Sequence, residues 1–314
     1  MKIALCGLWH VHAEGYYKTA AEYADVIGVY EPNPKWREAF CSKYGVHPFA
    51  TFEELLASGA DAAIVCTATD QHADVIVRLA EAGMDIFTEK VLALTSADCE
   101  RIEAAIMANH VKFVISFPHK YSAGVQTVKK IVDGGELGKI NYFRFRNVHN
   151  GSTGDWLPTH FYSEKECGGG AMIDLGAHGM YLAEWICGMP SAAKSVFTRA
   201  CDREDTKARN TDGVEDNAVT VMQYDNGCIA INETGFVSVG FPMTLEVGGE
   251  LGRVTLCGSR VEKQLTGMKA AEEVALESAL PSPLEQFCTG RILPGCGIRE
   301  AKNLTRLMEM AYGR

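Results

Sequence analysis

The sequence lacks any uninterrupted apolar run of the length that a membrane-spanning helix needs, and it lacks runs of lysine or arginine. Its 40 acidic side chains outnumber its 30 basic ones, which gives a formal net charge of -10 at pH 7. An acidic chain without a basic stripe is a poor partner for nucleic acid or for an anionic membrane surface. We therefore expect neither of these partners.

Paired cysteine motifs are also missing. The 11 cysteines are odd in number, extend from Cys6 to Cys296 and form no C-x-x-C pair. We expect them to be reduced and mostly buried thiols of a cytoplasmic protein. The apolar start of the chain is interrupted by His10, His12 and Glu14. Because no small-residue cleavage site follows, we interpret this start as a first strand and not as a signal peptide.

The first third of the chain has the pattern of an α/β domain. Up to about Phe117, short apolar runs alternate with amphipathic stretches, and caps mark helix starts at Asn33, Thr51 and Thr95. A length of 314 residues favours two domains. We predict an N-terminal Rossmann doubly wound parallel sheet over residues 1–118, with strands at residues 2–6, 26–30, 62–67, 85–87 and 111–117.

The pattern changes from about Tyr121 onward. Alternation of apolar and polar residues predicts a C-terminal α+β domain over residues 119–314, built on a largely antiparallel open sheet. Asp225-Asn226-Gly227 predicts a tight hairpin, and a helix over residues 299–312 ends the chain. The expected strands are at residues 139–148, 193–198, 218–224, 228–233, 244–247 and 253–257.

The turn after the first strand has only part of a dinucleotide-binding fingerprint. Of the glycines in G-x-G-x-x-G only Gly7 is present, and Trp9 stands where the second would be. Gly7 is equally well explained as a simple turn at the end of a strand. Glu31, roughly twenty residues further on, stands where an acid accepts the ribose hydroxyls of NAD. Since Pro32-Asn33 offers no cation for a 2′-phosphate, NAD is favoured over NADP, although Glu31 could also be a solvated acid.

Polar residues follow two further strands. Thr67, Thr69 and His72 come after a buried run, at an edge where a nicotinamide would lie, although a helix cap would also explain them. Glu89 and Lys90 end the next strand-like stretch. A lysine there could hydrogen-bond a substrate hydroxyl and stabilise negative charge on its oxygen, while a surface salt bridge is the alternative.

A glycine-rich segment carries an acid and a histidine. Gly168-Gly169-Gly170 is followed by Asp174 and His178, four residues apart in an apolar run. On one helix both side chains would leave the same face. A carboxylate one turn away can orient the imidazole and favour its protonated form, so the pair could exchange protons. A partly buried histidine satisfied by a local acid is the alternative.

Together these motifs resemble one family. Glu89-Lys90-Val91 and the segment from Gly168 to His178 are similar to the E-K-P and G-G-G-x-x-x-D-x-G-x-H motifs of the Gfo/Idh/MocA oxidoreductases, and the likeness covers essentially the whole chain. The resemblance implies hydride transfer between a nicotinamide cofactor and a hydroxyl carbon of a sugar, polyol or related small molecule. It implies that His178 takes the hydroxyl proton, that Asp174 orients the imidazole or contacts substrate, and that Lys90 binds the reacting oxygen.

The resemblance also implies further contacts. It implies a homo-oligomer, a dimer or tetramer, formed through the C-terminal sheet. The expected substrate contacts are Lys90, Tyr121, Trp156, Asp174 and His178. The expected cofactor contacts are Gly7, Leu8, Trp9, His10, Glu31, Thr67, Thr69, His72, Glu89 and Lys90.

Some positions depart from the family pattern. The glycine turn is short, Val91 replaces a proline, and Tyr181 stands where many members have an aspartate. Ordinary loop packing would account for Trp156 as well as substrate binding does. A metal at His10 and His12 is not expected, because no neighbouring cysteine or acid completes a ligand set in the sequence.

Two other functions stay open at the level of the sequence. The missing glycines would suit a regulatory protein of the same fold that senses a cofactor or sugar without catalysis. A redox-neutral NAD-dependent glycosidase or epimerase would use transient oxidation to activate a neighbouring carbon.

Overall fold

The computed structural model describes residues 1–201, 210 and 212–314. Its contacts divide the chain into two compact units. The first unit consists of Met1–Ser116 and Pro281–Thr305, and the second consists of Phe117–Leu280 and Arg306–Arg314. A single boundary at residue 118 does not describe this division, because the chain returns to the first unit near its end.

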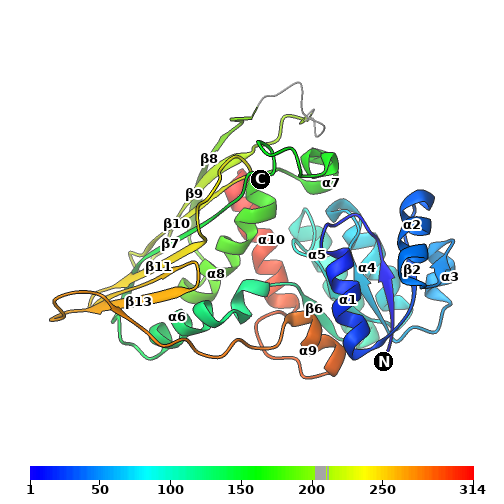
Figure 1. Cartoon of the computed structure of the whole chain (residues 1–314), viewed down its shortest axis with the longest axis horizontal. Coiled ribbons are helices and arrows are strands. Elements are labelled where there is room, and N and C mark those ends of the chain that lie inside the picture. Colours follow the sequence, from blue (N-terminus) through cyan, green and yellow to red (C-terminus); the bar gives the residue numbers. More distant parts are fainter. Residues whose placement is uncertain (202–209, 211) are drawn as a thin grey trace. The chain divides into compact units, whose positions relative to one another are not determined.

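The first unit, which includes α1 to α5 in Figure 1, contains a parallel sheet. Its six strands lie in the order β3-β2-β1-β4-β5-β6. Its central strands β1 and β4 are apolar and buried on both faces, as expected for a parallel sheet between helices. The sheet confirms the predicted Rossmann fold, but the two-residue β3 was not predicted. The strands are β1 (Lys2–Cys6), β2 (Asp25–Tyr30), β3 (Pro48–Phe49), β4 (Ala62–Val65), β5 (Asp85–Thr88) and β6 (Phe113–Ile115).

Helices connect these strands, and their starts follow local sequence chemistry. The side chains of Asn33, Thr51 and Thr95 each accept a hydrogen bond from a backbone N–H of the first helical turn, as predicted. Right-handed crossovers place α1 on the face opposite α4 and α5. The helices are α1 (Ala13–Tyr23), α2 (Pro34–Tyr44), α3 (Phe52–Leu56), η1 (Thr69–Gln71), α4 (His72–Glu81), α5 (Ser96–Asn109) and α9 (Pro283–Thr289).

The late segment of the first unit packs against early helices and strands. Helix α9 contacts α1 and β6, and the ring of Phe287 lies 5.9 Å from that of Phe87. The Ile115 N–H donates to the carbonyl of Cys296 at 2.9 Å. These contacts bury apolar side chains that are distant in sequence, so the local pattern of the chain does not reveal them.

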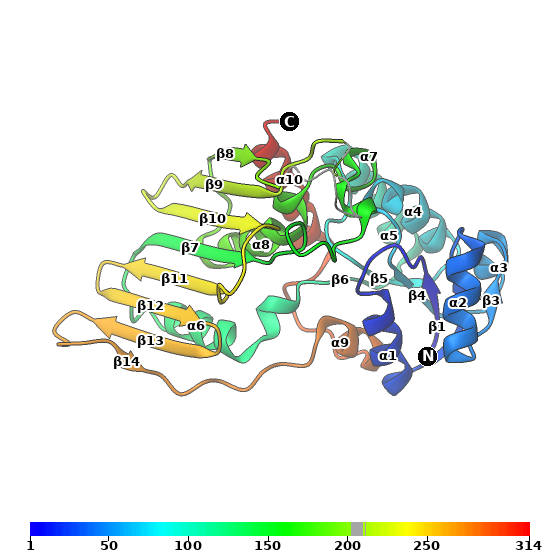
Figure 2. The same cartoon turned by 45° about the horizontal axis from the view of Figure 1, so that its top comes forward.

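The second unit contains an eight-stranded sheet in the order β14-β13-β12-β11-β7-β10-β9-β8 (Figure 2). Only β7 and β10 pair in parallel among its described strands, so the sheet is largely antiparallel, as predicted. The Asp225-Asn226-Gly227 turn joins β9 to β10, and its Gly227 has a φ of 88°. The strands are β7 (Ile140–Val148), β8 (Ala192–Thr198), β9 (Asn217–Gln223), β10 (Ile229–Gly235), β11 (Thr244–Gly249), β12 (Gly252–Cys257), β13 (Arg260–Leu265) and β14 (Glu272–Glu273).

Helices cover one face of this second sheet (Figures 1 and 2). The π-helical turn η4 (Met172–Gly176) and helix α8 (Ala177–Cys187) contact β7 and β10, while α6 (Ala123–Asp133) contacts β12 and β13. The remaining helices are η2 (Pro118–Tyr121), η3 (Thr159–Tyr162), α7 (Glu164–Cys167) and α10 (Ile298–Tyr312), which contributes residues to both units.

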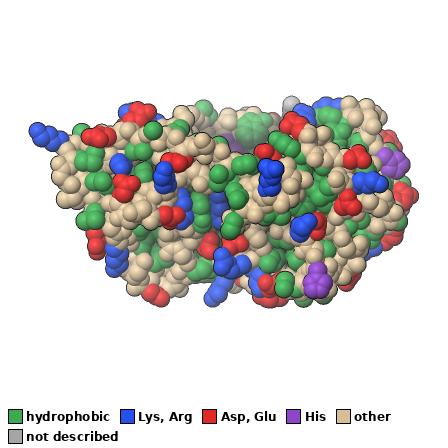
Figure 3. All heavy atoms as spheres, turned by 90° about the horizontal axis from the view of Figure 1, so that it is seen from below, with side chains coloured by type: hydrophobic (Ala, Val, Ile, Leu, Met, Phe, Trp, Pro, Cys, Tyr) green, Lys and Arg blue, Asp and Glu red, His purple; other side chains and the backbone are tan. Residues whose placement is uncertain are grey.

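The surface carries charges of both signs. On the face drawn in Figure 3, basic and acidic side chains are interspersed and form no large region of one sign. Among the helices of the described residues, none combines the length and the apolar character that crossing a bilayer requires.

Gly179 sets the distance between α8 and the sheet. A Cβ atom at this position would lie 2.0 Å from Oδ1 of Asn232 and 2.8 Å from the ring of Phe145. Asn232 has little freedom to yield, because its amide donates to the carbonyl of Gly176 at 2.7 Å. A glycine is therefore required where α8 crosses β7 and β10.

We predict that Gly179→Ala lowers the free energy of unfolding by about 1–3 kcal/mol, the usual cost of overpacking a core. Gly15→Ala is the matched control, because Gly15 is exposed in the first turn of α1 with no atom near its added Cβ. That control should be neutral or stabilise by up to about 1 kcal/mol. Urea unfolding of both variants measures the difference, and equal stabilities would contradict this account of α8.

Candidate active site

The predicted cofactor-binding residues gather at one edge of the first sheet. Gly7 to His10 follow β1, Glu31 follows β2, Thr67 and Thr69 follow β4, and Glu89 and Lys90 follow β5. The strands β2, β1, β4 and β5 are consecutive neighbours in the parallel sheet, so their carboxyl ends lie side by side. This edge is where sheets of this kind bind their ligands.

Gly7 is required by the close approach of two chain segments. Its φ is 91°, and a Cβ atom would lie 2.6 Å from the backbone nitrogen of Thr67. Its N–H donates to the carbonyl of Tyr30 at 2.7 Å. A side chain at position 7 would therefore separate the β1 turn from the end of β4.

Glu31 joins the β1 turn to the start of α2. It is only 3% exposed, and its two carboxylate oxygens accept hydrogen bonds from the N–H groups of Leu8 at 2.7 Å and Asn33 at 2.9 Å. Glu31 is thus a buried acid and not a solvated one. A cation does lie beside this strand end: Arg37 of α2 donates to the Glu31 carbonyl at 2.6 Å. The residues directly after Glu31, Pro32 and Asn33, carry no cation. Arg37 comes close to the end of β2 because the first turn of α2 brings its side chain back toward Glu31.

Glu89 is the most constrained acid at this edge. Its Oε1 lies 2.6 Å from Nδ1 of His12 and 3.6 Å from Nδ1 of His10, and the hydroxyl of Tyr16 also donates to it. Its Oε2 accepts the N–H of Lys90 at 3.0 Å. Burial alone would raise the pKa of the Glu89 carboxyl, but the charges of His10 and His12 hold this pKa well below its ordinary value. Glu89 is therefore anionic although it is buried.

His72 holds the segment that follows Lys90. Its ring is 1% exposed, with Nδ1 3.0 Å from the carbonyl of Val91 and 3.1 Å from that of Leu92. Its Nε2 lies 3.2 Å from the carbonyl of Thr67. Both ring nitrogens thus face the backbone, so the imidazole acts on the position of the Lys90 segment. Lys90 itself is 5% exposed.

The catalytic candidates of the second unit lie in η4 and α8. The segment is not a single regular α-helix as predicted, because Asp174 lies in the π-helical turn and His178 follows at the start of α8. His178 is 6% exposed, and its Nδ1 lies 3.0 Å from the hydroxyl of Tyr181. The same hydroxyl accepts the N–H of His119 at 3.2 Å. Tyr181 therefore orients the His178 ring through its Nδ1.

Tyr181 is a functional candidate that sequence reasoning missed. In the sequence it stands out only as a departure from the family's aspartate. In the structure it is buried, and its ring stacks on Phe117 with 4.3 Å between the ring centroids. His119 packs edge-on against His178 at 4.5 Å. The signal of Tyr181 in the sequence is its spacing of three residues from His178, which places both side chains on one helix face.

The triple glycine has a structural reason. A Cβ atom at Gly170 would lie 1.9 Å from the carbonyl oxygen of Glu215, and one at Gly169 would lie 2.1 Å from the hydroxyl of Tyr312. The buried carboxylate of Glu215 accepts hydrogen bonds from Gly170 N at 3.0 Å, Met172 N at 2.8 Å and Tyr312 at 2.7 Å. This acid was also missed, because its partners are distant in sequence.

The two aromatic substrate candidates differ in their surroundings. Tyr121 is 6% exposed at the end of η2, whereas Trp156 is 52% exposed in the loop before η3. The indole N–H of Trp156 donates to Asn150 at 3.1 Å, and its ring lies 4.6 Å from that of His149. These contacts are those of loop packing, the alternative that the sequence left open.

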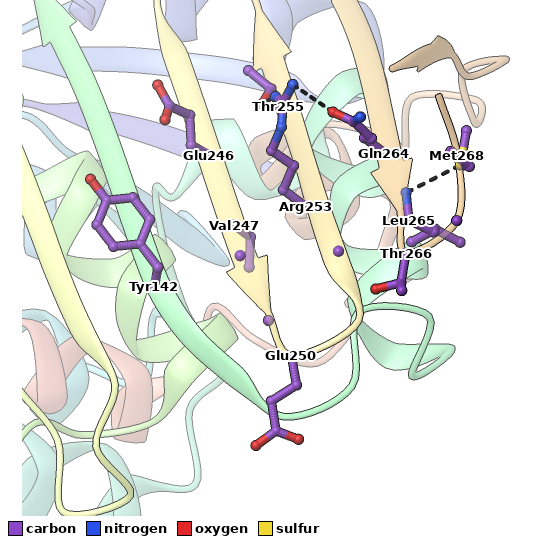
Figure 4. Close-up of a pocket in the computed structure, with 14 residues that line it drawn as sticks. Tyr142, Glu246, Val247, Glu250, Arg253, Thr255, Gln264, Leu265, Thr266 and Met268 are labelled. Atoms are coloured by element: carbon purple, nitrogen blue, oxygen red, sulfur yellow. Dashed lines mark hydrogen bonds between the residues drawn. The ribbon is translucent and has the colours of Figure 1, made fainter. Parts of the chain in front are cut away.

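A shallow pocket of about 620 Å³ lies on the uncovered face of the second sheet (Figure 4). Tyr142, Glu246 and Arg253 line it together with glycine-rich strand ends. Leu256 of β12 faces the helices, since it lies against Gly124 of α6. Because neighbouring residues of a strand point to opposite faces, the side chains that line the pocket point away from the helices. None of the predicted site residues lines this pocket.

One unit has a Rossmann-type sheet with polar residues at its carboxyl edge, and the other is built on an open sheet. This combination is typical of a two-part dinucleotide-binding protein. The chain belongs to the GFO/IDH/MocA family. Residues 1–117 match the model of the "Oxidoreductase family, NAD-binding Rossmann fold", and residues 125–255 match that of the "GFO/IDH/MocA C-terminal domain". The protein is thus an NAD-binding oxidoreductase, which confirms the family, class and cofactor expected from the sequence.

Individual relatives agree with this assignment. The chain is 25% identical over 262 residues to scyllo-inositol 2-dehydrogenase (NAD(+)) of Bacillus subtilis (strain 168), a match that covers 81% of this chain and 73% of that protein. It is 26% identical over 253 residues to D-glucoside 3-dehydrogenase of Escherichia coli (strain K12), with 75% and 70% of the two chains covered.

Solved structures share the fold. A levoglucosan dehydrogenase in complex with NADH and levoglucosan has a TM-score of 0.84 at 17% identity, with 100% of this chain and 96% of that chain covered. The aldose-aldose oxidoreductase from Caulobacter crescentus, complexed with glycerol, has a TM-score of 0.82 at 20% identity with the same coverage. At these identities the likeness concerns the fold alone.

The buried His72 predicts a pH dependence of stability. Burial lowers the pKa of the His72 imidazole below its ordinary value of 6.5. The unfolded chain therefore binds the proton at a higher pH than the folded protein does. The contribution of the neutral His72 imidazole to the free energy of unfolding is fully present above pH 6.5. It is lost as the pH falls from 6.5 toward the lower pKa of His72 in the folded protein.

We predict that His72→Asn, which keeps a donor toward the carbonyls, flattens the loss of stability between about pH 6.5 and 5.5 by about 1 kcal/mol. Urea unfolding at several pH values measures this slope. His47→Asn is the control, since His47 is an exposed histidine of the same unit and its replacement should leave the slope as in the wild type. An unchanged slope in the His72 variant would contradict the proposed neutral, buried imidazole.

Proposed function

We propose that this protein oxidises a secondary hydroxyl of a sugar or polyol with NAD⁺, and that it catalyses the reverse reduction. The observation that carries the proposal is the gathering of Gly7, Glu31, Thr67 and Lys90 along the carboxyl edge of a parallel sheet whose family binds NAD. The relatives named after scyllo-inositol and D-glucoside support a substrate with ring hydroxyls.

The first unit supplies the groups that fit the cofactor. Position 7 of the β1 turn has no side chain, so the backbone there can approach a ligand closely. The Glu31 oxygens that accept the N–H groups of Leu8 and Asn33 keep further lone pairs for ribose hydroxyls. When bound, NAD supplies the hydride acceptor at nicotinamide C4. Trp9, His10, Thr69, His72 and Glu89 are the remaining proposed cofactor contacts, with His72 acting through the backbone of the Lys90 segment.

Three side chains carry the proposed proton chemistry. The Lys90 ammonium binds the substrate oxygen and stabilises negative charge that develops on it. Nε2 of His178 takes the hydroxyl proton as the carbon loses its hydride, so that the C–O bond becomes a carbonyl. Asp174 contacts neighbouring substrate hydroxyls or the imidazole, while Tyr181 positions the ring through its hydroxyl. Positioned proton transfer of this kind contributes about 10²–10⁴-fold.

We predict that His178→Ala reduces kcat by about 10²–10⁴-fold, because no group remains to accept the proton. Tyr181→Phe keeps the stacked ring and should lower kcat less, by about tenfold, and shift the pH profile of kcat. NADH formation on a panel of inositols and glucosides measures both. Wild-type turnover in His178→Ala would reject the proposed base.

Measurements of cofactor binding and turnover together distinguish the proposed dehydrogenase from a non-catalytic sensor. Calorimetry with NAD⁺ and NADH should show binding to the wild type, and binding should persist in His178→Ala. Binding without turnover on any polyol would favour the sensor, and conversion of a glycoside or epimer without net NADH would favour a redox-neutral enzyme.

We also propose that copies of this chain associate through the uncovered face of the second sheet. Val196, Val219, Val221 and Ile229 are 39–68% exposed on β8, β9 and β10. Val219 pairs with Val196, so these side chains are neighbours across strands. Lys194 lies opposite Val221 and Gln223 opposite Ile229, so the exposed apolar side chains share this face with polar ones, a mixture that suits an interface between subunits. All 11 cysteines are free thiols, which supports a reducing, cytoplasmic location.

We predict that Val219→Lys with Val221→Lys converts a dimer or tetramer to monomer, because the interface would have to bury two unpaired charges. Val239→Lys is the control, since Val239 is 71% exposed but lies outside these strands. Light scattering after size-exclusion chromatography measures the mass. A wild-type monomer, or an oligomer that survives both lysines, would contradict this interface.

A further inference from the structure

His10, His12 and Glu89 form a compact cluster at the end of β5 and the start of α1. One ligand atom from each lies within 4.8 Å of the others. Glu89 is 1% exposed and His10 is 6% exposed, while 48% of the His12 side chain is exposed. Glu89 and His10 are thus buried, and solvent reaches the cluster at His12.

Three side chains with metal-binding atoms converge on one point in this cluster. His12 can donate an N–H to the Glu89 carboxylate, whereas Nδ1 of His10 accepts the His12 backbone N–H and so presents a lone pair near that carboxylate. A shared proton can occupy this position, as the 2.6 Å separation between His12 Nδ1 and Glu89 Oε1 shows. A metal ion can replace that proton, because deprotonated imidazoles and carboxylates are metal ligands.

We propose that His10, His12 and Glu89 bind a divalent transition ion, with Zn²⁺ as the best match. Two imidazoles and one carboxylate are a known Zn²⁺ ligand set, and such sites keep a further position open. The sequence did not reveal it, because Glu89 follows His12 by 77 positions, and the carboxyl ends of β1 and β5 come near each other only in the folded sheet, on either side of β4.

The two separations between the histidine nitrogens and the Glu89 oxygen are close to those around this ion. Ligand atoms around tetrahedral Zn²⁺ lie about 3.4 Å apart. Here the two nitrogen–oxygen separations are 2.6 and 3.6 Å, on either side of that value. Nδ1 of His10 also accepts the His12 N–H at 3.2 Å, and the ion would replace this long hydrogen bond.

Outer partners already hold the carboxylate in place. The Tyr16 hydroxyl and the Lys90 N–H both donate to Glu89, and Tyr16 is itself 2.7 Å from the hydroxyl of Ser116. Metal-binding carboxylates are typically oriented by such hydrogen bonds. The open coordination position lies on the side of the exposed His12, where water or an oxygen of a ligand would complete the site.

The test uses untagged full-length protein that has been treated with EDTA, with neither NAD nor substrate present. Titration calorimetry with ZnCl₂ should show one site. His10→Gln, His12→Gln and Glu89→Gln should each weaken it more than about 100-fold, since loss of an outer partner alone costs 10–100-fold. His47→Gln, at an exposed histidine of the same unit, is the matched control and should bind as the wild type does.

Co²⁺ tests the identity of the ligands. Its visible spectrum should show coordination by nitrogen and oxygen and should disappear in His12→Gln. A thiolate-to-cobalt charge-transfer band would assign the ion to the cysteines and overturn the proposal. The proposal is equally overturned if the wild type binds no Zn²⁺, or if the three variants bind it unchanged. Because no cofactor is present, either failure leaves the proposed hydride transfer untouched.

Discussion

The buried charge of Glu89 is the constraint on which the candidate site of the first unit depends. An anionic carboxylate removed from water costs several kcal/mol unless charges and hydrogen bonds replace its hydration. His10, His12, Tyr16 and the Lys90 N–H provide that replacement. These groups come from the β1 turn, helix α1 and the segment after β5. The buried charge of Glu89 therefore holds three parts of the carboxyl edge of the sheet in place relative to one another.

The second unit uses the same principle with a different acid. Glu215 accepts hydrogen bonds from Gly170, Met172 and Tyr312, and so it fixes the start of the segment that leads to Asp174 and His178. In both units a glycine allows the close approach that the hydrogen bonds require, since a Cβ at Gly7 or at Gly170 would overlap backbone atoms. The motif residues are therefore held by buried acids, one of which, Glu215, lies outside every motif.

Much of the fold was predictable because its signals are local. The caps at Asn33, Thr51 and Thr95, the turn at Gly227 and the buried strands β1 and β4 depend on residues within a few positions of each other. The strands β13 and β14 and the return of α9 to α1 were not predicted. Their side chains are ordinary in sequence, and only pairing with distant segments makes them strands or core.

The sequence by itself determined the family, the order of most strands and helices, and which polar residues follow which strand. Local propensity and short motifs are sufficient for these, since each is a property of a few consecutive residues. Only the tertiary structure decided that Tyr181 holds His178, that Arg37 reaches the end of β2, and that Glu89 joins two histidines 77 and 79 positions away. Such contacts depend on which strand ends lie close together in the sheet and on the need to neutralise a buried charge. Both conditions involve residues that are far apart in the sequence, so no short segment of the chain reveals them.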